Sequence, residues 1–394
     1  MNKKVNQYGS HFIDQSDIQN VIKVLENKSL TAGREVIKFE NEFSRKVGSK
    51  YAVTCSNGTA ALHLAILSLG IKKDDLVIVP SITFVATYNA VIMAGAQPII
   101  SDVDSHTGLI ELKHVDELIK KYGRKIKAVI VVHLNGNVSK VHDIRLKYKN
   151  LRIIEDSCHA LGSKFFFKKW HNVGNCKYSD FSTFSFHPVK NITTGEGGMI
   201  TTNNYKMFQK LKLYRSHHIT RLSLKHKTFP YKINNLGYNY RLTDFQCALG
   251  RSQLKKLNNF KNYRKKLVNQ YVKNLKSKES YLKFVDDNFS DSFWHLFVLK
   301  INFKKIKMTR NLVMNKLKKK GIGSQIHYIP LYRHNYIKNY YNSSIHGKYL
   351  GSEDYYSQII TLPLHAKLNL EDIDLISKEL ISILEKKKVN SILI

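Results

Sequence analysis

Short apolar runs rich in Val and Ile alternate with segments of helical periodicity in the first half of the chain. Runs of this length, bounded by turn residues, indicate buried strands. We expect strands at Tyr51–Cys55, Leu76–Val79, Pro98–Ser101, Ala128–His133, Leu151–Glu155, Phe181–Ser185 and Met199–Thr202. Helices are expected between them at Gly58–Leu69, Val115–Lys121 and Val141–Tyr148. This alternation predicts an α/β fold with a mostly parallel sheet.

The pattern changes near residue 255. Thr243 to Gln246 matches a capping box, which predicts the start of a long basic helix running towards Lys276. A strand at Trp294–Ile301 and helices at Thr309–Lys320 and Leu370–Lys387 are expected after it. We therefore expect a large domain over residues 1–255, with the N-terminal segment, and a smaller α+β domain over residues 256–394.

Charge is the unusual feature of the composition. The 394 residues are 43% hydrophobic and 24% charged, which is ordinary for a globular protein, but 64 Lys+Arg against 30 Asp+Glu give a net charge of +34. Such a charge would suit nucleic acid, an anionic membrane surface or an anionic substrate. Because the excess is spread over the whole length, we interpret it as compositional bias and expect neither nucleic acid nor a membrane as a partner.

The chain shows no sign of disulfides, metal ligation or membrane insertion. Its 4 cysteines form no CxxC pair, so neither a disulfide framework nor a metal site is expected. The N-terminus has no apolar run typical of a signal peptide, and the most apolar stretch, residues 76–100, is interrupted by Pro80 and Gly95. We expect a reduced, cytoplasmic enzyme.

Two residues stand out as candidate catalytic groups. Lys190 follows an apolar strand and a proline and precedes a glycine-rich turn. A partly desolvated lysine has a lowered pKa and can form a Schiff base with a carbonyl, although an ordinary lysine at a strand end is an equal alternative. Asp156 follows a predicted strand, at the edge where α/β proteins bind ligands. It could face the ring nitrogen of pyridoxal phosphate, or simply cap the next turn.

A turn of small residues, Ser56 to Ala61, opens the first predicted helix of the sheet. The free N–H groups of a helix start, with the Thr59 hydroxyl, favour a phosphate, and Ser185 could add a hydroxyl. Small residues also begin many buried helices. The polar and aromatic segment from Gly237 to Asp244 precedes a capped helix and is equally compatible with a simple turn.

The order of these features is more specific than any one of them. A phosphate turn, Phe84 after a strand, Asp156, and then Lys190 with Ser185 follow the order of a fold-type I pyridoxal-phosphate enzyme. With the segments around Lys190 and Asn239, the sequence resembles the DegT/DnrJ/EryC1/StrS family over residues 8–370. Segments 157–163, 249–256 and 325–330 are most similar to its pseudaminic-acid-pathway members. The resemblance implies a seven-stranded, mostly parallel sheet in the large domain.

The resemblance also implies roles for single residues. Lys190 would link covalently to pyridoxal 5′-phosphate and Asp156 would pair with its ring nitrogen. The remaining cofactor contacts would be Gly58, Thr59 and Ser185 at the phosphate, Phe84 stacked on the ring, and His159 close by. Asn239 would reach the active site of a neighbouring subunit, which implies a homodimer with shared sites. Contacts to a UDP-sugar would come from Tyr8, Lys28, Ser29, Leu30, Thr31, His327, Tyr328, Ile329 and Pro330.

The implied reaction moves an amino group from L-glutamate to the 4-keto position of a UDP-linked 4-keto-6-deoxy-amino-sugar. Another nucleotide or keto position on the same scaffold stays an alternative. A sugar dehydratase of this family has histidine at the lysine position, so Lys190 argues against it. A non-catalytic nucleic-acid-binding protein has no supporting motif here. His218 stands where many family members have glycine, which leaves the shape of that loop open.

Overall fold

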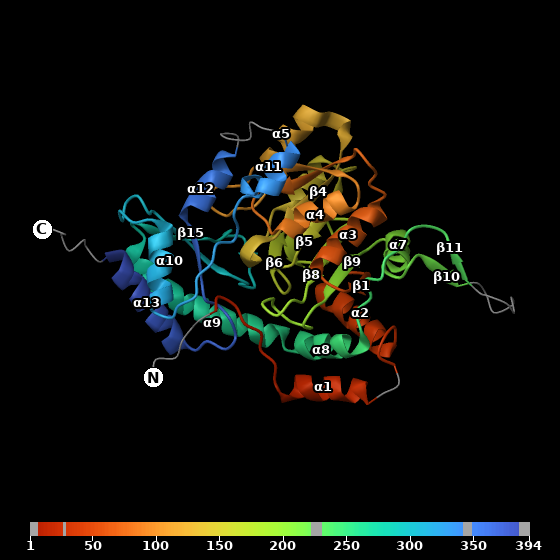
Figure 1. Ribbon diagram of the computed structural model, residues 1–394, viewed down its shortest axis with the longest axis horizontal. Helices are drawn as coiled ribbons and strands as arrows, with labels where there is room; N and C mark the ends of the chain where they lie inside the picture. Colours follow the sequence, from red (N-terminus) through yellow and green to blue (C-terminus); the bar gives the residue numbers. More distant parts are fainter. Residues whose placement is uncertain (1–6, 27–28, 222–230, 342–348, 386–394) are drawn as a thin grey trace, which may run out of the picture.

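The computed structural model describes residues 7–26, 29–221, 231–341 and 349–385 (Figure 1). Its centre is a seven-stranded sheet, with each strand near its predicted place. In spatial order the strands are β1 (Tyr51–Cys55), β9 (Gly198–Thr202), β8 (Phe181–Ser185), β5 (Arg152–Asp156), β4 (Ile126–Val132), β2 (Leu76–Pro80) and β3 (Gln97–Ser101). Only β9 runs antiparallel to its neighbours in this sheet. The prediction of a mostly parallel seven-stranded sheet is confirmed.

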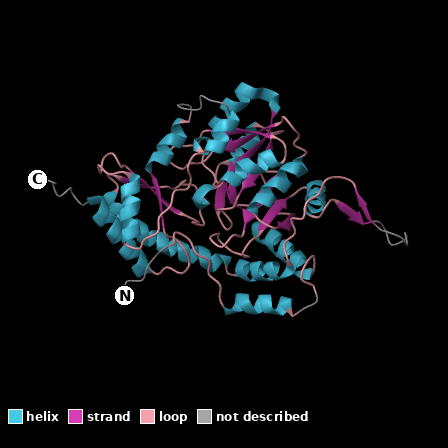
Figure 2. Ribbon diagram, in the orientation of Figure 1, coloured by secondary structure: helices cyan, strands magenta, loops and turns pink. Residues whose placement is uncertain are grey.

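Helices cover both faces of this sheet (Figure 2). The apolar helix α3 (Gly58–Leu69) lies on one face with α4 (Val85–Met93) and α7 (Tyr205–Arg215). The other face carries α5 (Leu112–Tyr122) and α6 (Val141–Lys147). Val77 and Val79 join the core under α3, whereas Ile78 joins the core under α5, as expected when successive side chains point to opposite faces.

The N-terminal helices α1 (Gln15–Leu25) and α2 (Arg34–Val47) both pack on α8 (Asp244–Lys255). The predicted capping box at Thr243 starts α8, with the Thr243 hydroxyl and the Gln246 side chain in reciprocal bonds. The prediction of one continuous helix is wrong, because the chain bends at Lys256 before α9 (Leu257–Leu275). Helix α9 then spans two cores, with Leu257 in the core of the large domain and Leu267 in a second one.

The second core lies under a three-stranded antiparallel sheet. Its strands are β12 (Leu282–Phe284), β14 (Phe297–Ile301) and β15 (Ile359–Leu362), packed with α9, α10 (Arg310–Lys319) and α13 (Leu370–Glu385). Thr309 caps α10 as its sequence suggests, and Lys387 lies outside the described residues. Helices α11 (Asn335–Tyr341) and α12 (Leu350–Gln358) return to the large sheet, where Ile337 and Tyr355 are buried. The domain boundary at residue 255 stays a prediction.

Two small sheets complete the architecture. One joins β6 (Lys164–Phe167) and β7 (Lys169–Asn172) as a hairpin beside β13 (Ser290–Asp291). The other pairs β10 (Ile219–Arg221) with β11 (Tyr231–Ile233), and it extends away from the body at the right of Figure 1. No strand was predicted at either place from the sequence pattern.

Candidate active site

A cavity of about 450 Å³ opens where β5 and β8 end and α3 begins. Ligands of open α/β sheets bind at this carboxyl edge. The cavity brings together ten of the side chains predicted from the sequence: Tyr8, Gly58, Thr59, Phe84, Asp156, His159, Ser185, Lys190, His327 and Tyr328. They come from segments spread over more than 300 residues, so the fold assembles one site from separate motifs.

The start of α3 forms a cradle of free backbone donors. The Asn57 side chain caps the helix by accepting from the Ala60 N–H at 2.8 Å. Among the described residues, no acceptor is recorded for the N–H groups of Gly58 and Thr59, as is usual in a first helical turn. A Cβ atom on Gly58 would lie 2.9 Å from Ser185 Cβ, so only glycine leaves this approach open. An anion such as a phosphate fits here.

Asp156 is held by two donors at the opposite side of the cavity. Its Oδ2 accepts from Thr87 Oγ1 at 2.9 Å, and its Oδ1 accepts from the Cys158 N–H at 3.2 Å. Thr83 Oγ1 lies 2.8 Å from Thr87 Oγ1 and extends the chain of hydroxyls. Sequence reasoning missed Thr87, because an isolated threonine in an apolar helix carries no signal of its own. The carboxylate is therefore oriented before any ligand binds.

Lys190 lies on the turn after β8, where its N–H donates to the His187 carbonyl at 2.9 Å. Burial lowers the pKa of the Lys190 amine, and the neighbouring Cys158 and Asp156 oppose that shift. No ion pair joins Lys190 to a carboxylate of the described chain. A lysine in this state loses its proton more easily than a solvated one and can act as a nucleophile.

Two neutral histidines and a tyrosine line the other wall. The Asn135 N–H donates to His159 Nδ1 at 3.3 Å, so His159 Nε2 carries the proton and faces Tyr328 Oη at 3.2 Å. Burial, then the Lys190 charge, sets the pKa of His159 well below its usual range. The same two causes lower the pKa of His327 to about 3, and its Nδ1 lies 2.9 Å from the Thr361 hydroxyl. The wall therefore offers hydrogen bonds without charge.

These groups fit pyridoxal phosphate. The cofactor needs a phosphate site, a lysine amine for its aldehyde and an acid opposite its ring nitrogen. The α3 cradle, Lys190 and Asp156 supply them, and the half-exposed ring of Phe84 lines the same cavity 6.0 Å from the Tyr328 ring. The fit rests on the glycine approach at position 58 and on the buried amine at position 190.

Other predicted site residues do not line this cavity. Asn239 pairs through its backbone with Ser216, and the Asp244 N–H donates to the Leu30 carbonyl at 2.9 Å. Ser29, Leu30, Thr31 and Asn239 therefore lie near the start of α8. Ile329 is exposed and Pro330 is buried, both outside the lining, while Lys28 lies outside the described residues. The roles proposed for these residues stay predictions.

The loop before Asn239 explains one departure from the family pattern. His218 has a φ of 54°, in the left-handed region where glycine is favoured. Gly237 packs against it so closely that a Cβ atom there would lie 2.1 Å from the His218 nitrogen. The backbone thus keeps the shape of a glycine-containing loop although the residue is histidine.

The described part of the chain contains no cluster of three or more metal-ligating side chains. Within the same residues, no helix combines the length and apolar character needed to cross a membrane.

The comparisons with known proteins agree with the site. Residues 11–381 match the model of the DegT/DnrJ/EryC1/StrS aminotransferase family. The chain is 35% identical over 384 residues to a UDP-4-amino-4,6-dideoxy-N-acetyl-β-L-altrosamine transaminase of Campylobacter jejuni, covering 97% of this chain and 98% of that protein.

Solved structures give the same result. Helicobacter pylori PseC, an aminotransferase involved in the biosynthesis of pseudoaminic acid, superposes with a TM-score of 0.87 at 30% identity, covering 97% of this chain and 100% of that one. The PLP-form of the putative sugar aminotransferase Spr1654 of Streptococcus pneumoniae gives 0.85 at 27% identity, covering 96% and 98%. The chain therefore belongs to the DegT/DnrJ/EryC1/StrS aminotransferase family and is a pyridoxal-phosphate-dependent aminotransferase.

Proposed function

We propose that this enzyme moves an amino group from L-glutamate to the C4 ketone of a UDP-linked 4-keto-6-deoxy-amino-sugar, in the synthesis of a pseudaminic-acid-type surface sugar. The observation that carries the proposal is the single cavity that holds Lys190, Asp156 and the α3 phosphate cradle together with Tyr8, His327 and Tyr328. The likeness to the altrosamine transaminase and to PseC supports the choice of sugar.

Each residue around the cofactor has a task. When bound, pyridoxal phosphate supplies an aldehyde carbon that takes up the amino group and later passes it on, and a ring that withdraws electrons. Lys190 holds the cofactor at rest and, once free, moves a proton between the sugar C4 and the cofactor C4′ carbon, for which its lowered pKa is suited. Asp156 keeps the ring nitrogen protonated, and Thr87 holds the carboxylate that does so.

The remaining cofactor contacts follow from the lining. Gly58 and Thr59 would offer backbone N–H groups and Ser185 a hydroxyl to the phosphate, and Phe84 would stack on the ring. His159 donates from Nε2 towards Tyr328 and is neutral, so it orients that tyrosine without adding charge beside the ring.

Uncharged aromatic and imidazole rings form one wall of the cavity. Tyr8 and His327 have ring centroids 4.9 Å apart, and Tyr328 follows directly. Burial raises the pKa of both tyrosines, so they stay protonated and can donate to sugar oxygens. Such a wall suits a hexose ring. Ile329 and Pro330, next along the chain, would contact the nucleotide side of the substrate.

We also propose that two copies share their sites. Asn239 and the segment from Ser29 to Thr31 gather near the start of α8, outside this chain's own cavity, and would complete the cavity of the second copy, with Lys28 beside them. Neighbouring helix α1 carries Ile18, Ile22 and Leu25 at a spacing of one helical face, and all three side chains are exposed. A face of this kind suits burial against another subunit.

Mixing two inactive variants tests the sharing. Lys190→Ala and Asn239→Ala should each be inactive or strongly impaired alone. If Asn239 acts in the other subunit, mixed dimers contain one intact site, so co-refolded mixtures should regain about a quarter of wild-type activity, since half of the dimers are mixed and each has one of two sites. No recovery in mixtures shown to exchange subunits would contradict the shared site.

Turnover with purified sugar nucleotides tests the reaction itself. UDP-linked 4-keto-6-deoxy-amino-sugars should accept the amino group of glutamate, with product seen by mass spectrometry and the C4 configuration read by NMR. Lys190→Ala serves as the blank. An axial C4 amine supports the pseudaminic assignment, and an equatorial amine contradicts it while leaving the aminotransferase intact. Faster turnover of a differently linked or 3-keto sugar would favour the alternative acceptor.

A further inference from the structure

The β6–β7 hairpin presents an aromatic pair that nothing in the described chain covers. Its inner face carries Phe165 and His171, which stack on each other at 5.3 Å and are buried. The strand register pairs Phe166 with Trp170 on the outer face. These two side chains are 53% and 54% exposed, and their rings meet edge to face at 5.7 Å. Large apolar groups at such exposure mark interaction surfaces.

Lysines surround this pair. Lys164 precedes it on the outer face, and Lys168 and Lys169 form the tip of the hairpin; all three are exposed. Within the described chain, no carboxylate forms an ion pair with any of them. The hairpin therefore combines two exposed rings with three cations that lack an acidic partner.

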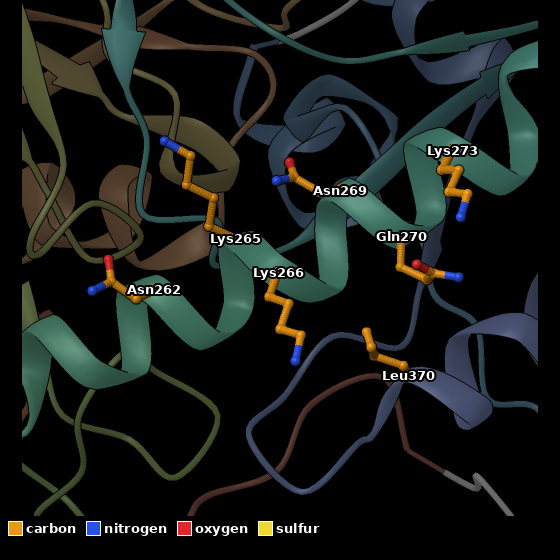
Figure 3. A pocket seen from close by; sticks show the side chains of 7 residues that line it. All are labelled: Asn262, Lys265, Lys266, Asn269, Gln270, Lys273 and Leu370. Carbon is orange, nitrogen blue, oxygen red and sulfur yellow. The ribbon is translucent and has the colours of Figure 1, made fainter.

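The basic surface continues onto α9. Asp291 of β13 lies opposite Lys164 in the register of the small sheet. Its carboxylate forms ion pairs with the amines of Lys261 at 2.6 Å and Lys265 at 3.9 Å. Beyond them, Lys265, Lys266 and Lys273 project around a groove of about 410 Å³ whose lining contains no acidic side chain (Figure 3). One carboxylate is thus shared by two lysines of α9, and the region stays positive.

We propose that the β6–β7 hairpin docks the enzyme on an anionic phospholipid surface, with Phe166 and Trp170 in the headgroup region and the lysines on lipid phosphates. The Trp170 indole, with its apolar ring and polar N–H, favours this boundary, Phe166 adds apolar area, and lysine stems reach along the boundary while their charges stay in water. Apolar insertion together with a basic patch gives the two signals that stable peripheral binding needs. This mode of binding requires no spanning helix.

Two other occupants are less suited to the patch. Single-stranded nucleic acid stacks successive, nearly parallel bases on ring faces, whereas the rings of Phe166 and Trp170 stand at 71° to each other. A second copy seated symmetrically on the same patch would bring Lys164, Lys168 and Lys169 against the same three lysines. An anionic bilayer is complementary in both charge and apolar character.

The tryptophan content gives a direct readout. The chain has 2 tryptophans, so Trp294→Phe leaves Trp170 as the only one. Emission of this full-length variant, loaded with pyridoxal phosphate, should shift to the blue with vesicles of phosphatidylglycerol and phosphatidylcholine, and stay unchanged with phosphatidylcholine alone. Salt at 1 M should reverse the shift, since the screening length falls from about 10 Å at 0.1 M to about 3 Å.

Cosedimentation with the same vesicles separates the contributions. Phe166→Ser/Trp170→Ser should lower the apparent vesicle affinity at least about tenfold, because burying two half-exposed aromatic side chains exceeds the about 1.4 kcal/mol that a factor of ten requires. Lys164→Gln/Lys168→Gln/Lys169→Gln should remove the preference for anionic lipid. Tyr336→Ala and Lys72→Gln/Lys73→Gln, exposed residues on other elements, should bind as the wild type does.

Several results would overturn the proposal. Unchanged Trp170 emission with anionic vesicles would do so, as would equal binding to neutral vesicles. A blue shift that depends on protein concentration without lipid would assign the patch to a second copy. Stronger quenching by single-stranded DNA than by vesicles would assign it to nucleic acid. The assay does not depend on turnover, so its outcome is separate from that of the proposed reaction.

Discussion

The hydrogen bond from Thr87 to Asp156 can be tested as a positioning contact. Thr87 Oγ1 donates to Asp156 Oδ2 at 2.9 Å, and the two side chains are 0% and 6% exposed. Water cannot readily replace the hydroxyl at this depth. Thr87→Val keeps the branched shape of the side chain and removes only the donor, so the carboxylate retains the Cys158 N–H at 3.2 Å as its second contact.

The loss of stability expected for Thr87→Val follows from the charge of the Asp156 carboxylate that accepts the hydrogen bond. Hydrogen bonds to charged groups contribute about 1.5–3 kcal/mol, against about 0.5–1.5 kcal/mol for neutral pairs. Thr87→Val should therefore lower the free energy of unfolding by about 1.5–3 kcal/mol. Thr83→Val is the matched control, because its hydroxyl contacts Thr87 at 2.8 Å and not the carboxylate. It should cost no more than a neutral hydrogen bond.

A double-mutant cycle isolates the interaction. Urea denaturation of the cofactor-free wild type, Thr87→Val, Asp156→Asn and the double variant would give a coupling energy between the two positions. We expect about 1 kcal/mol or more, because the asparagine side chain introduced by Asp156→Asn retains an acceptor but not the charge. Additive effects within about 0.5 kcal/mol would refute the reasoning, since Thr87 would then stabilise the helix and not the carboxylate.

Three further predictions concern the cavity. Lys190→Ala should lose turnover by at least about 10²–10⁴-fold and should no longer be labelled when borohydride reduces the bound cofactor; near-normal turnover would contradict the assignment. Gly58→Ala should weaken the binding of pyridoxal phosphate about 5- to 150-fold in a spectrophotometric titration, because the new Cβ would lie 2.9 Å from Ser185 Cβ and overpacking costs about 1–3 kcal/mol. An unchanged affinity would argue against a phosphate site at the start of α3. Folding stability should fall as pH drops from about 6.5 towards 3, because the unfolded chain protonates His327 while burial holds the folded pKa of His327 at about 3. In pH-dependent denaturation, His327→Asn should reduce the total loss of unfolding free energy over this range by up to about 5 kcal/mol. An unchanged pH dependence would exclude His327 as its source.

Local patterns in the sequence were sufficient for much of the fold. Strands β2 and β4 are nearly continuous apolar runs, as expected of strands buried on both faces, so their places could be read from the sequence pattern. The helix at Gly58–Leu69 was predicted with its observed bounds, since Asn57 caps one end and Gly70 the other. Lys190 and Asp156 were singled out by the order of their segments along the chain, and both line the cavity.

Contacts between distant segments were decided by the tertiary structure. Thr87 donates a hydrogen bond to Asp156, which lies 69 residues later in the chain, and the sequence around Thr87 contains no pattern that predicts this contact. The helix expected to run on towards Lys276 is interrupted at Lys256, and the second helix contributes Leu257 to one core and Leu267 to another. Phe165, Phe166 and Phe167 form one apolar run, yet pairing with β7 turns Phe166 outward beside Trp170. A sequence records which side chains are apolar or charged, whereas the face each one occupies depends on the strands and helices that pack around it.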